Sequence, residues 1–228
     1  GVLWFGEPGP AEFPDRHYRN VPPLVMNGRV FCQGWRLPKG QSTILSFDAY
    51  NGLRYWERVI PGAIRLGMPS VSGNLACTAD SLFVAAGSVC HRLDAISGVT
   101  QARYETPASP DGTHPDWGYV AVANGVLYGS ASTPDSPRTA KTPNSLFMLM
   151  GKSRYSGAIF AVDLASGKQL WVHRGKEIRN SLIVLNRDNL FFTENRGLPT
   201  PAMLPLRKKD AVVTFTSTVF SVVALEAD

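Results

Sequence analysis

A hairpin motif that recurs along this chain constrains its fold more than any other sequence feature. In Ala161-Val-Asp-Leu-Ala-Ser-Gly-Lys-Gln-Leu-Trp171, an acidic residue opens a turn, a glycine closes it and an apolar strand returns. Asp163 can accept hydrogen bonds from backbone N–H groups of the turn, and Gly167 sits where the chain needs a positive φ. The motif therefore predicts two antiparallel strands joined by a short turn.

The motif occurs four times, and the last copy is cut short. The positions that recur are the acidic residue, the glycine and the tryptophan: Asp48, Gly52 and Trp56; Asp94 and Gly98; Asp163, Gly167 and Trp171; and Glu226. Ala102 stands where the second copy should have its tryptophan, so we expect a looser junction there. The shortest interval is 46 residues (94 − 48), which suits a four-stranded propeller blade.

A second hairpin precedes each copy of the motif. Asn27-Gly28 and Asn124-Gly125 lie between runs rich in β-branched and aromatic residues, which is the strongest short-range signal for a type I′ turn. Each repeat thus supplies four antiparallel strands. The sequence predicts an all-β fold, a β-propeller with about four blades present. We divide the single domain 1–228 into repeats 1–52, 53–98, 99–167 and 168–228, with loop insertions at 132–156 and 194–217.

The complete copy of the motif resembles the repeats of pyrroloquinoline-quinone-type (quinoprotein-like) β-propellers. Ala161, Asp163, Gly167, Lys168 and Trp171 match that family's Ala-x-Asp-x-x-x-Gly-Lys-x-x-Trp pattern. The resemblance implies that each tryptophan docks between adjacent blades, where an indole buries a large apolar area. It also implies a periplasmic or otherwise extracytoplasmic location.

The number of repeats leaves two arrangements open. Propellers of this family have more blades than the four seen here, so the chain either closes a small ring or forms part of a ring of seven or eight blades. We expect the second, with a protein partner or the remaining half of the propeller completing the ring. Either arrangement hides strand edges that would otherwise pair with other chains.

Composition narrows the functional classes. Only 18% of residues are charged, the formal net charge is +5, and no nucleic-acid-binding motif is present. No apolar run is long enough for a transmembrane helix, and the first residues lack the features of a signal peptide. The three cysteines, Cys32, Cys77 and Cys90, make no Cys-x-x-Cys pair, which argues against a zinc ribbon or a haem-attachment motif.

The lengths of the connections predict where a ligand binds. Within each blade the strand direction alternates, so the tight turns gather on one side, the tight-turn face. The long connections gather on the other side, the long-loop face, and long loops on a rigid scaffold commonly carry function. The candidate residues of this face are Arg16, His17, Trp35, Arg36, Arg65, His114, Trp117 and Arg196. The four arginines and two tryptophans suit an anion- or sugar-binding rim, whereas the histidines have no partner at metal-ligand spacing.

We interpret the chain as a non-catalytic propeller scaffold that binds a ligand or partner on the long-loop face, with no cofactor. One alternative is a part of a quinoprotein dehydrogenase that binds pyrroloquinoline quinone and calcium. A second alternative is a carbohydrate- or peptide-binding propeller. The sequence shows no local cluster of oxygen ligands for calcium and no metal-binding motif, which favours the scaffold over the enzyme.

Overall fold

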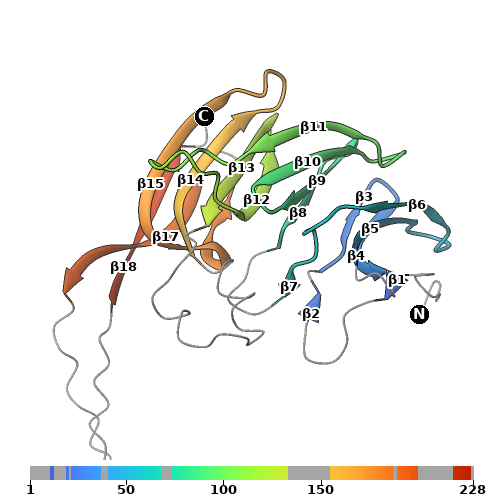
Figure 1. Ribbon diagram of the computed structural model, residues 1–228, viewed down its shortest axis with the longest axis horizontal. Helices are drawn as coiled ribbons and strands as arrows, with labels where there is room; N and C mark the ends of the chain where they lie inside the picture. The colour runs from blue at the N-terminus through green and yellow to red at the C-terminus, as the bar shows by residue number, and fades with distance from the viewer. Residues whose placement is uncertain are drawn as a thin grey trace, which may run out of the picture.

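The computed structural model describes residues 11–12, 19–20, 22–36, 41–67, 73–132, 155–186, 189–199 and 218–226. Within these ranges the chain forms β-strands and a single short 3-10 segment, η1 (Asn180–Leu182). The strands make successive antiparallel sheets that follow one another along an open arc, with the first and fourth sheets at opposite ends (Figure 1). This all-β arrangement confirms the predicted fold class.

The first sheet contains five strands and the second sheet contains four. The first consists of β3 (Leu24–Met26), β4 (Arg29–Arg36), β5 (Gln41–Asp48) and β6 (Arg54–Val59), and β1 (Ala11–Glu12) also pairs with β4. The second consists of β8 (Leu75–Cys77), β9 (Ser81–Ala86), β10 (Val89–Asp94) and β11 (Thr100–Glu105). A small sheet pairs β2 (Arg19–Asn20) with β7 (Leu66–Gly67).

The third and fourth sheets continue the series. The third consists of β12 (Trp117–Ala123), β13 (Val126–Ser132), β14 (Tyr155–Asp163) and β15 (Gln169–Arg179). The fourth consists of β16 (Val184–Leu185), β17 (Asn189–Pro199) and β18 (Thr218–Glu226). Since β17 reaches Pro199, the first part of the expected insertion at 194–217 is strand. The division into repeats stays a prediction.

The turns have the conformations that the sequence predicts. Asn27 and Asn124 have positive φ angles of 48° and 50°, and the glycine after each is also positive, as a type I′ turn requires. Gly167 has a φ of 70°. The Asp163 carboxylate accepts hydrogen bonds from the backbone N–H and the hydroxyl of Ser166. These bonds fix the turn between β14 and β15.

Three apolar clusters fill the spaces between successive sheets. Phe31 and Ile44 of the first sheet pack with Leu82 and Val84 of the second. A second cluster joins the second and third sheets, and a third joins the third and fourth sheets. The innermost strands also touch in order, because β3 contacts β8 and β8 contacts β12. Sheets that pack face to face around a shared inner side are the arrangement of propeller blades.

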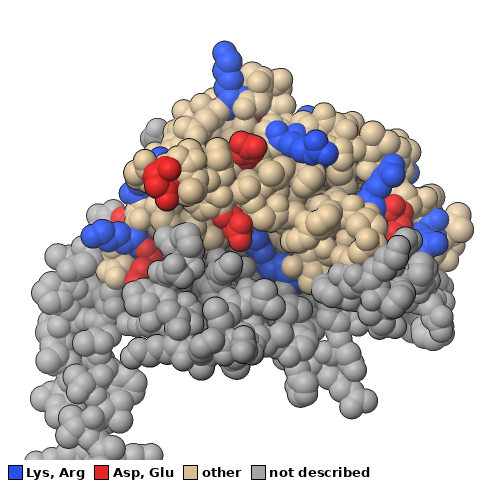
Figure 2. Space-filling model, viewed as in Figure 1, with Lys and Arg blue, Asp and Glu red and all other residues tan. Residues whose placement is uncertain are grey.

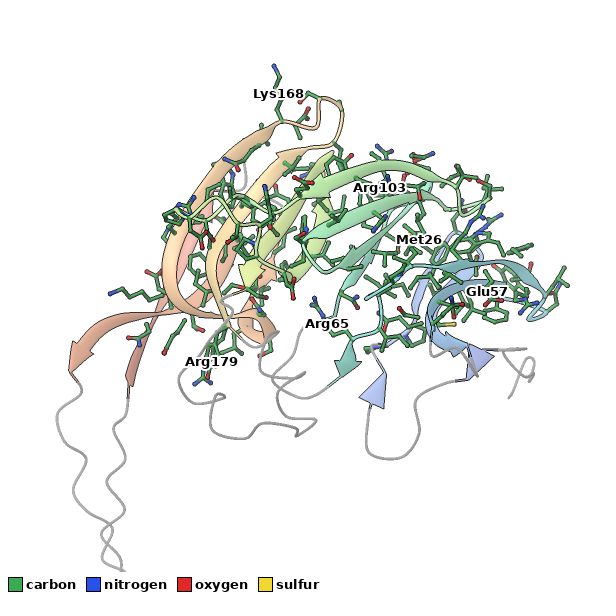
Figure 3. All side chains as sticks on the ribbon, in the orientation of Figure 1. Met26, Glu57, Arg65, Arg103, Lys168 and Arg179 are labelled. Carbon is green, nitrogen blue, oxygen red and sulfur yellow. The ribbon has the colours of Figure 1, made fainter. Side chains whose placement is uncertain are left out.

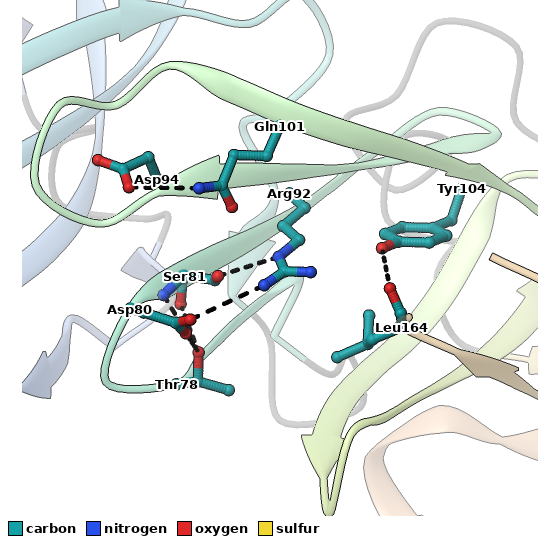
Figure 4. Close-up of polar contacts among 8 residues, drawn as sticks. All are labelled: Thr78, Asp80, Ser81, Arg92, Asp94, Gln101, Tyr104 and Leu164. Carbon is teal, nitrogen blue, oxygen red and sulfur yellow. Dashed lines mark hydrogen bonds and ion pairs between the residues drawn. The ribbon is translucent and has the colours of Figure 1, made fainter. Parts of the chain in front are cut away.

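The outer strands of the first and second sheets are each hydrogen-bonded to the turn of the next sheet. Trp56 in β6 donates a hydrogen bond from Nε1 to the Ala95 carbonyl oxygen, at 3.1 Å. In the second sheet the hydroxyl of Tyr104 donates to the Leu164 carbonyl oxygen, at 3.4 Å (Figure 4). Ala95 and Leu164 each follow the acidic residue of their turn, so the two acceptors are equivalent.

Tyr104 changes the interpretation of Ala102. The expected looser junction rested on Ala102 alone, but Tyr104 is 6% exposed and fills the space two residues further along the same strand face. Ala102 is half-buried and packs against the same cluster. The junction between the second and third sheets is therefore closed by a tyrosine in place of the expected tryptophan.

Candidate functional site

Of the eight residues that the sequence assigns to the long-loop face, the structure describes the side chains of three. Arg65, His114 and Trp117 are described in full. Trp35 and Arg36 lie at the C-terminal end of β4, and Arg196 lies within β17; their side chains are outside the described residues. Arg16 and His17 lie outside the described residues altogether.

Arg65 ties the connection after the first sheet to the start of the third sheet. Its guanidinium donates hydrogen bonds to the backbone carbonyl oxygens of Trp117 and Gly118, and its backbone N–H donates to Oε1 of Gln33 at 3.2 Å. Burial lowers the pKa of Arg65 to about 10, and the nearby Asp116 carboxylate partly opposes this shift. The side chain points into the inner end of the arc, between the second and third sheets (Figure 3).

Trp117 does not belong to a ligand-binding rim, which corrects the prediction from sequence. It is 1% exposed, its ring lies edge-on to Phe160 with centroids 4.8 Å apart, and its Nε1 donates to the Ser88 carbonyl oxygen. A Cβ on Gly129 would lie 2.2 Å from the ring, so a glycine is needed there. The Pro-rich segment before Trp117 suggested a loop, but the residue begins a buried strand.

His114 holds the connection between the second and third sheets. Its Nδ1 is hydrogen-bonded to the Thr106 carbonyl oxygen, and its Nε2 lies 3.6 Å from the Glu105 carboxylate. The Thr106 hydroxyl in turn donates to the Pro115 carbonyl oxygen at 2.6 Å. The imidazole is partly exposed, and it braces the two ends of its own loop.

Two buried polar groups that the sequence did not single out complete this side of the molecule. Asn74 is 1% exposed; its Nδ2 donates to the Ala63 and Ala85 carbonyl oxygens, and its Oδ1 accepts from Gln33. Asn180 is also 1% exposed, and its Oδ1 accepts hydrogen bonds from the hydroxyls of Ser130 and Ser156. Both asparagines connect segments that are separated in sequence. No spacing pattern in the sequence predicts such contacts.

A buried acid–imidazole pair lies between the third and fourth sheets. Nε2 of His173 in β15 is 2.9 Å from Oε2 of Glu194 in β17, and the Glu194 side chain is 8% exposed. A Cβ on Gly175 would lie 2.4 Å from the same carboxylate oxygen. No sequence pattern indicates this pair, because the partner of His173 comes from another sheet.

The described residues do not fit a calcium and quinone site. Within the described ranges no three His, Cys, Asp or Glu side chains are grouped to hold a metal ion. The turn carboxylates of Asp48, Asp94 and Asp163 accept hydrogen bonds within their own turns, on the tight-turn face. Basic and acidic side chains are interspersed on the surface seen in Figure 2. The described residues include no helix that could cross a membrane.

These sheets and their junctions define a partial β-propeller. No family model and no curated protein matches the sequence. The fold is similar to solved structures that include BamB from Moraxella catarrhalis (17% identity, TM-score 0.45, covering 75% of this chain and 44% of that one). Others are a quinohemoprotein alcohol dehydrogenase from Comamonas testosteroni (13%, 0.47, 76% and 33%) and the Pan2 WD40 domain of Neurospora crassa (9%, 0.47, 79% and 45%). The chain spans less than half the length of each.

Proposed function

We propose that this chain is a segment of a quinoprotein-like propeller that acts as a non-catalytic binding scaffold. In this proposal a ligand or protein partner contacts the long-loop face, and other polypeptide completes the ring. The chain works in the periplasm or another extracytoplasmic compartment, as the resemblance of its repeats to that family implies.

One observation supports the proposal: the polar side chains described on the long-loop face are hydrogen-bonded to backbone carbonyl oxygens. Arg65 binds the carbonyl oxygens that begin β12, His114 binds a carbonyl oxygen of its own loop, and Asn74 binds two more. Groups committed to backbone carbonyls are fixed in place and cannot move protons or bind a metal without breaking the junctions. They instead give the long connections a rigid base, which suits presentation of loops to a partner.

The scaffold and the dehydrogenase alternative are separated by adding the cofactor. The purified chain is mixed with pyrroloquinoline quinone and calcium chloride, free quinone is removed by desalting, and the visible absorbance and the melting temperature are recorded. We expect no retained quinone band and an unchanged melting temperature. Stoichiometric retention of quinone, together with a calcium-dependent rise in melting temperature, would establish the dehydrogenase alternative.

The rigid base itself is tested without any ligand. Hydrogen–deuterium exchange of the purified chain should show slow exchange of the amides at the start of β12 and around Asn74, because these segments are held from several sheets. Exchange as fast as in an unstructured loop would contradict the scaffold proposal.

A further inference from the structure

An aromatic residue recurs on the second strand of every sheet. We call the face that a sheet turns toward the next sheet in the chain its leading face, and the opposite face its trailing face. Each aromatic residue is paired with the residue two positions before the acidic residue of its turn, and all four therefore occupy the same leading-face position: Phe31, Phe83, Tyr128 and Phe191.

The fourth of these residues lacks the cover that the others have. Phe31 and Phe83 are 0% exposed and Tyr128 is 2% exposed, because the next sheet packs over them. Phe191 is only half-buried, and its cross-strand partner Val184 is 60% exposed. Ala224, opposite Phe191 on β18, is also exposed. The leading face of the fourth sheet therefore presents apolar side chains that an equivalent sheet would bury.

The trailing face of the first sheet is uncovered along its innermost strand, β3. Val25 in β3 is 64% exposed, whereas its counterparts Cys77 and Val122 are half-buried against the preceding sheet. Val30 is half-buried, whereas its counterparts in the second and third sheets are 0% exposed: Leu82 and Leu127. Toward the centre of this face, Leu45 and Phe47 are 0% and 8% exposed and cluster with Val30 and Cys32, so the apolar surface left open is the edge formed by β3.

We propose that the leading face of the fourth sheet docks on the trailing face of the first sheet of a second copy of this chain. The three internal junctions all join a leading face to a trailing face, and Phe191, Val184 and Val25 stand at positions that these junctions cover. The two faces lie at opposite ends of an open arc (Figure 1), so two copies can form two such junctions and close a ring. Eight sheets are within the range of known propellers. This inference rests on the proposed scaffold function and identifies the partner that completes the ring.

The mass of the purified chain in solution tests the proposal. Sedimentation velocity from about 1 µM to about 100 µM spans the affinities expected of a modest protein interface. We expect a reversible dimer. Phe191→Asp, Val184→Asp and Val25→Asp should each weaken association by at least about thirtyfold, because each places a charge in an apolar junction. Ile96→Asp is the matched control, since Ile96 is 67% exposed on a turn and should leave the dimer intact.

A mixture of two variants distinguishes this arrangement from a symmetric contact between identical faces. Phe191→Asp keeps the trailing face of the first sheet, and Val25→Asp keeps the leading face of the fourth. Each variant alone should be monomeric, while an equimolar mixture should form a heterodimer through the one intact junction. Failure of the mixture to associate, with both variants folded by circular dichroism, would overturn the proposal.

The experiments test the dimer and the proposed scaffold function separately. A chain that is monomeric at the highest concentration would overturn the dimer, and would assign the uncovered faces to a different polypeptide while leaving the scaffold function in place. A dimer that retains quinone would overturn the non-catalytic function and leave the interface in place.

Discussion

The ring of Trp56 lies directly over Gly98 of the next sheet, so close that a Cβ built on Gly98 would be 2.7 Å from the ring atom Cδ2. Gly98 also has a φ of 69°. The glycine of the turn thus has two roles: it adopts a left-handed conformation, and it leaves room for the tryptophan of the preceding sheet.

These two roles can be separated by comparing two glycines. Gly98→Ala should lower the free energy of unfolding by about 2–4 kcal/mol, from backbone strain and from displacement of the Trp56 ring. Gly167→Ala has nearly the same φ, with no atom within 4 Å of the built Cβ, and should cost only about 1–2 kcal/mol. Urea denaturation of both variants measures the difference. Equal losses would mean that the contact with Trp56 contributes nothing.

Replacement of Tyr104 tests whether the second junction is closed as tightly as the first. Trp56→Ala should cost about 3–5 kcal/mol, and Tyr104→Ala a comparable amount of about 2–4 kcal/mol, because both side chains are buried between sheets. Tyr104→Phe removes only a long hydrogen bond and should cost less than about 1 kcal/mol. A loss below about 1 kcal/mol for Tyr104→Ala would restore the expectation of a loose junction at Ala102.

Arg65 should contribute far more to stability than an exposed arginine with similar bonds. Arg65→Met leaves the carbonyl oxygens of Trp117 and Gly118 without their donor, and should cost about 2–3 kcal/mol. Arg58 also donates to two backbone carbonyls, at Gly98 and Ser97, but it is exposed. Arg58→Met should therefore cost less than about 1 kcal/mol. Similar losses for the two variants in urea denaturation would contradict this account.

The turn carboxylates should make the protein less stable in acid. The Ser166 hydroxyl, and then the Ser166 backbone N–H, lower the pKa of Asp163. As the pH falls toward the folded-state pKa, the unfolded chain binds protons that the folded chain does not, so the free energy of unfolding falls. Above the unfolded-state pKa of about 3.9 the contribution is complete. Asp163→Asn should flatten this dependence between about pH 2 and about pH 5, while a slope equal to wild type would assign it to other groups.

The local part of this structure could be predicted from sequence, and the long-range part could not. Asp163 and Gly167 predict their turn, because the interactions that form the turn lie within a few residues. Tyr104 was missed because the repeats were aligned at the tryptophan position alone. A residue two positions further along the strand reaches the equivalent carbonyl oxygen of the next turn.

The candidate site was harder for the same reason. Arg65 and Trp117 were both assigned to an exposed rim, because each follows or lies in a loop. Their partners come from other sheets: Arg65 reaches a carbonyl 53 residues away, and Nε1 of Trp117 reaches one 29 residues away. Likewise, His173 meets Glu194 only once two sheets have packed. Sequence spacing carries information about one hairpin at a time, and these contacts arise between hairpins.

The reach of Arg65 also bears on how the molecule comes apart. The main strand contacts join each sheet to its immediate neighbour, and a linear array of that kind can shed its end units one at a time. Arg65, in the connection between the first and second sheets, holds the third sheet directly. Loss of the first sheet would therefore also disturb the third sheet, so this single side chain should make unfolding of the array more all-or-none.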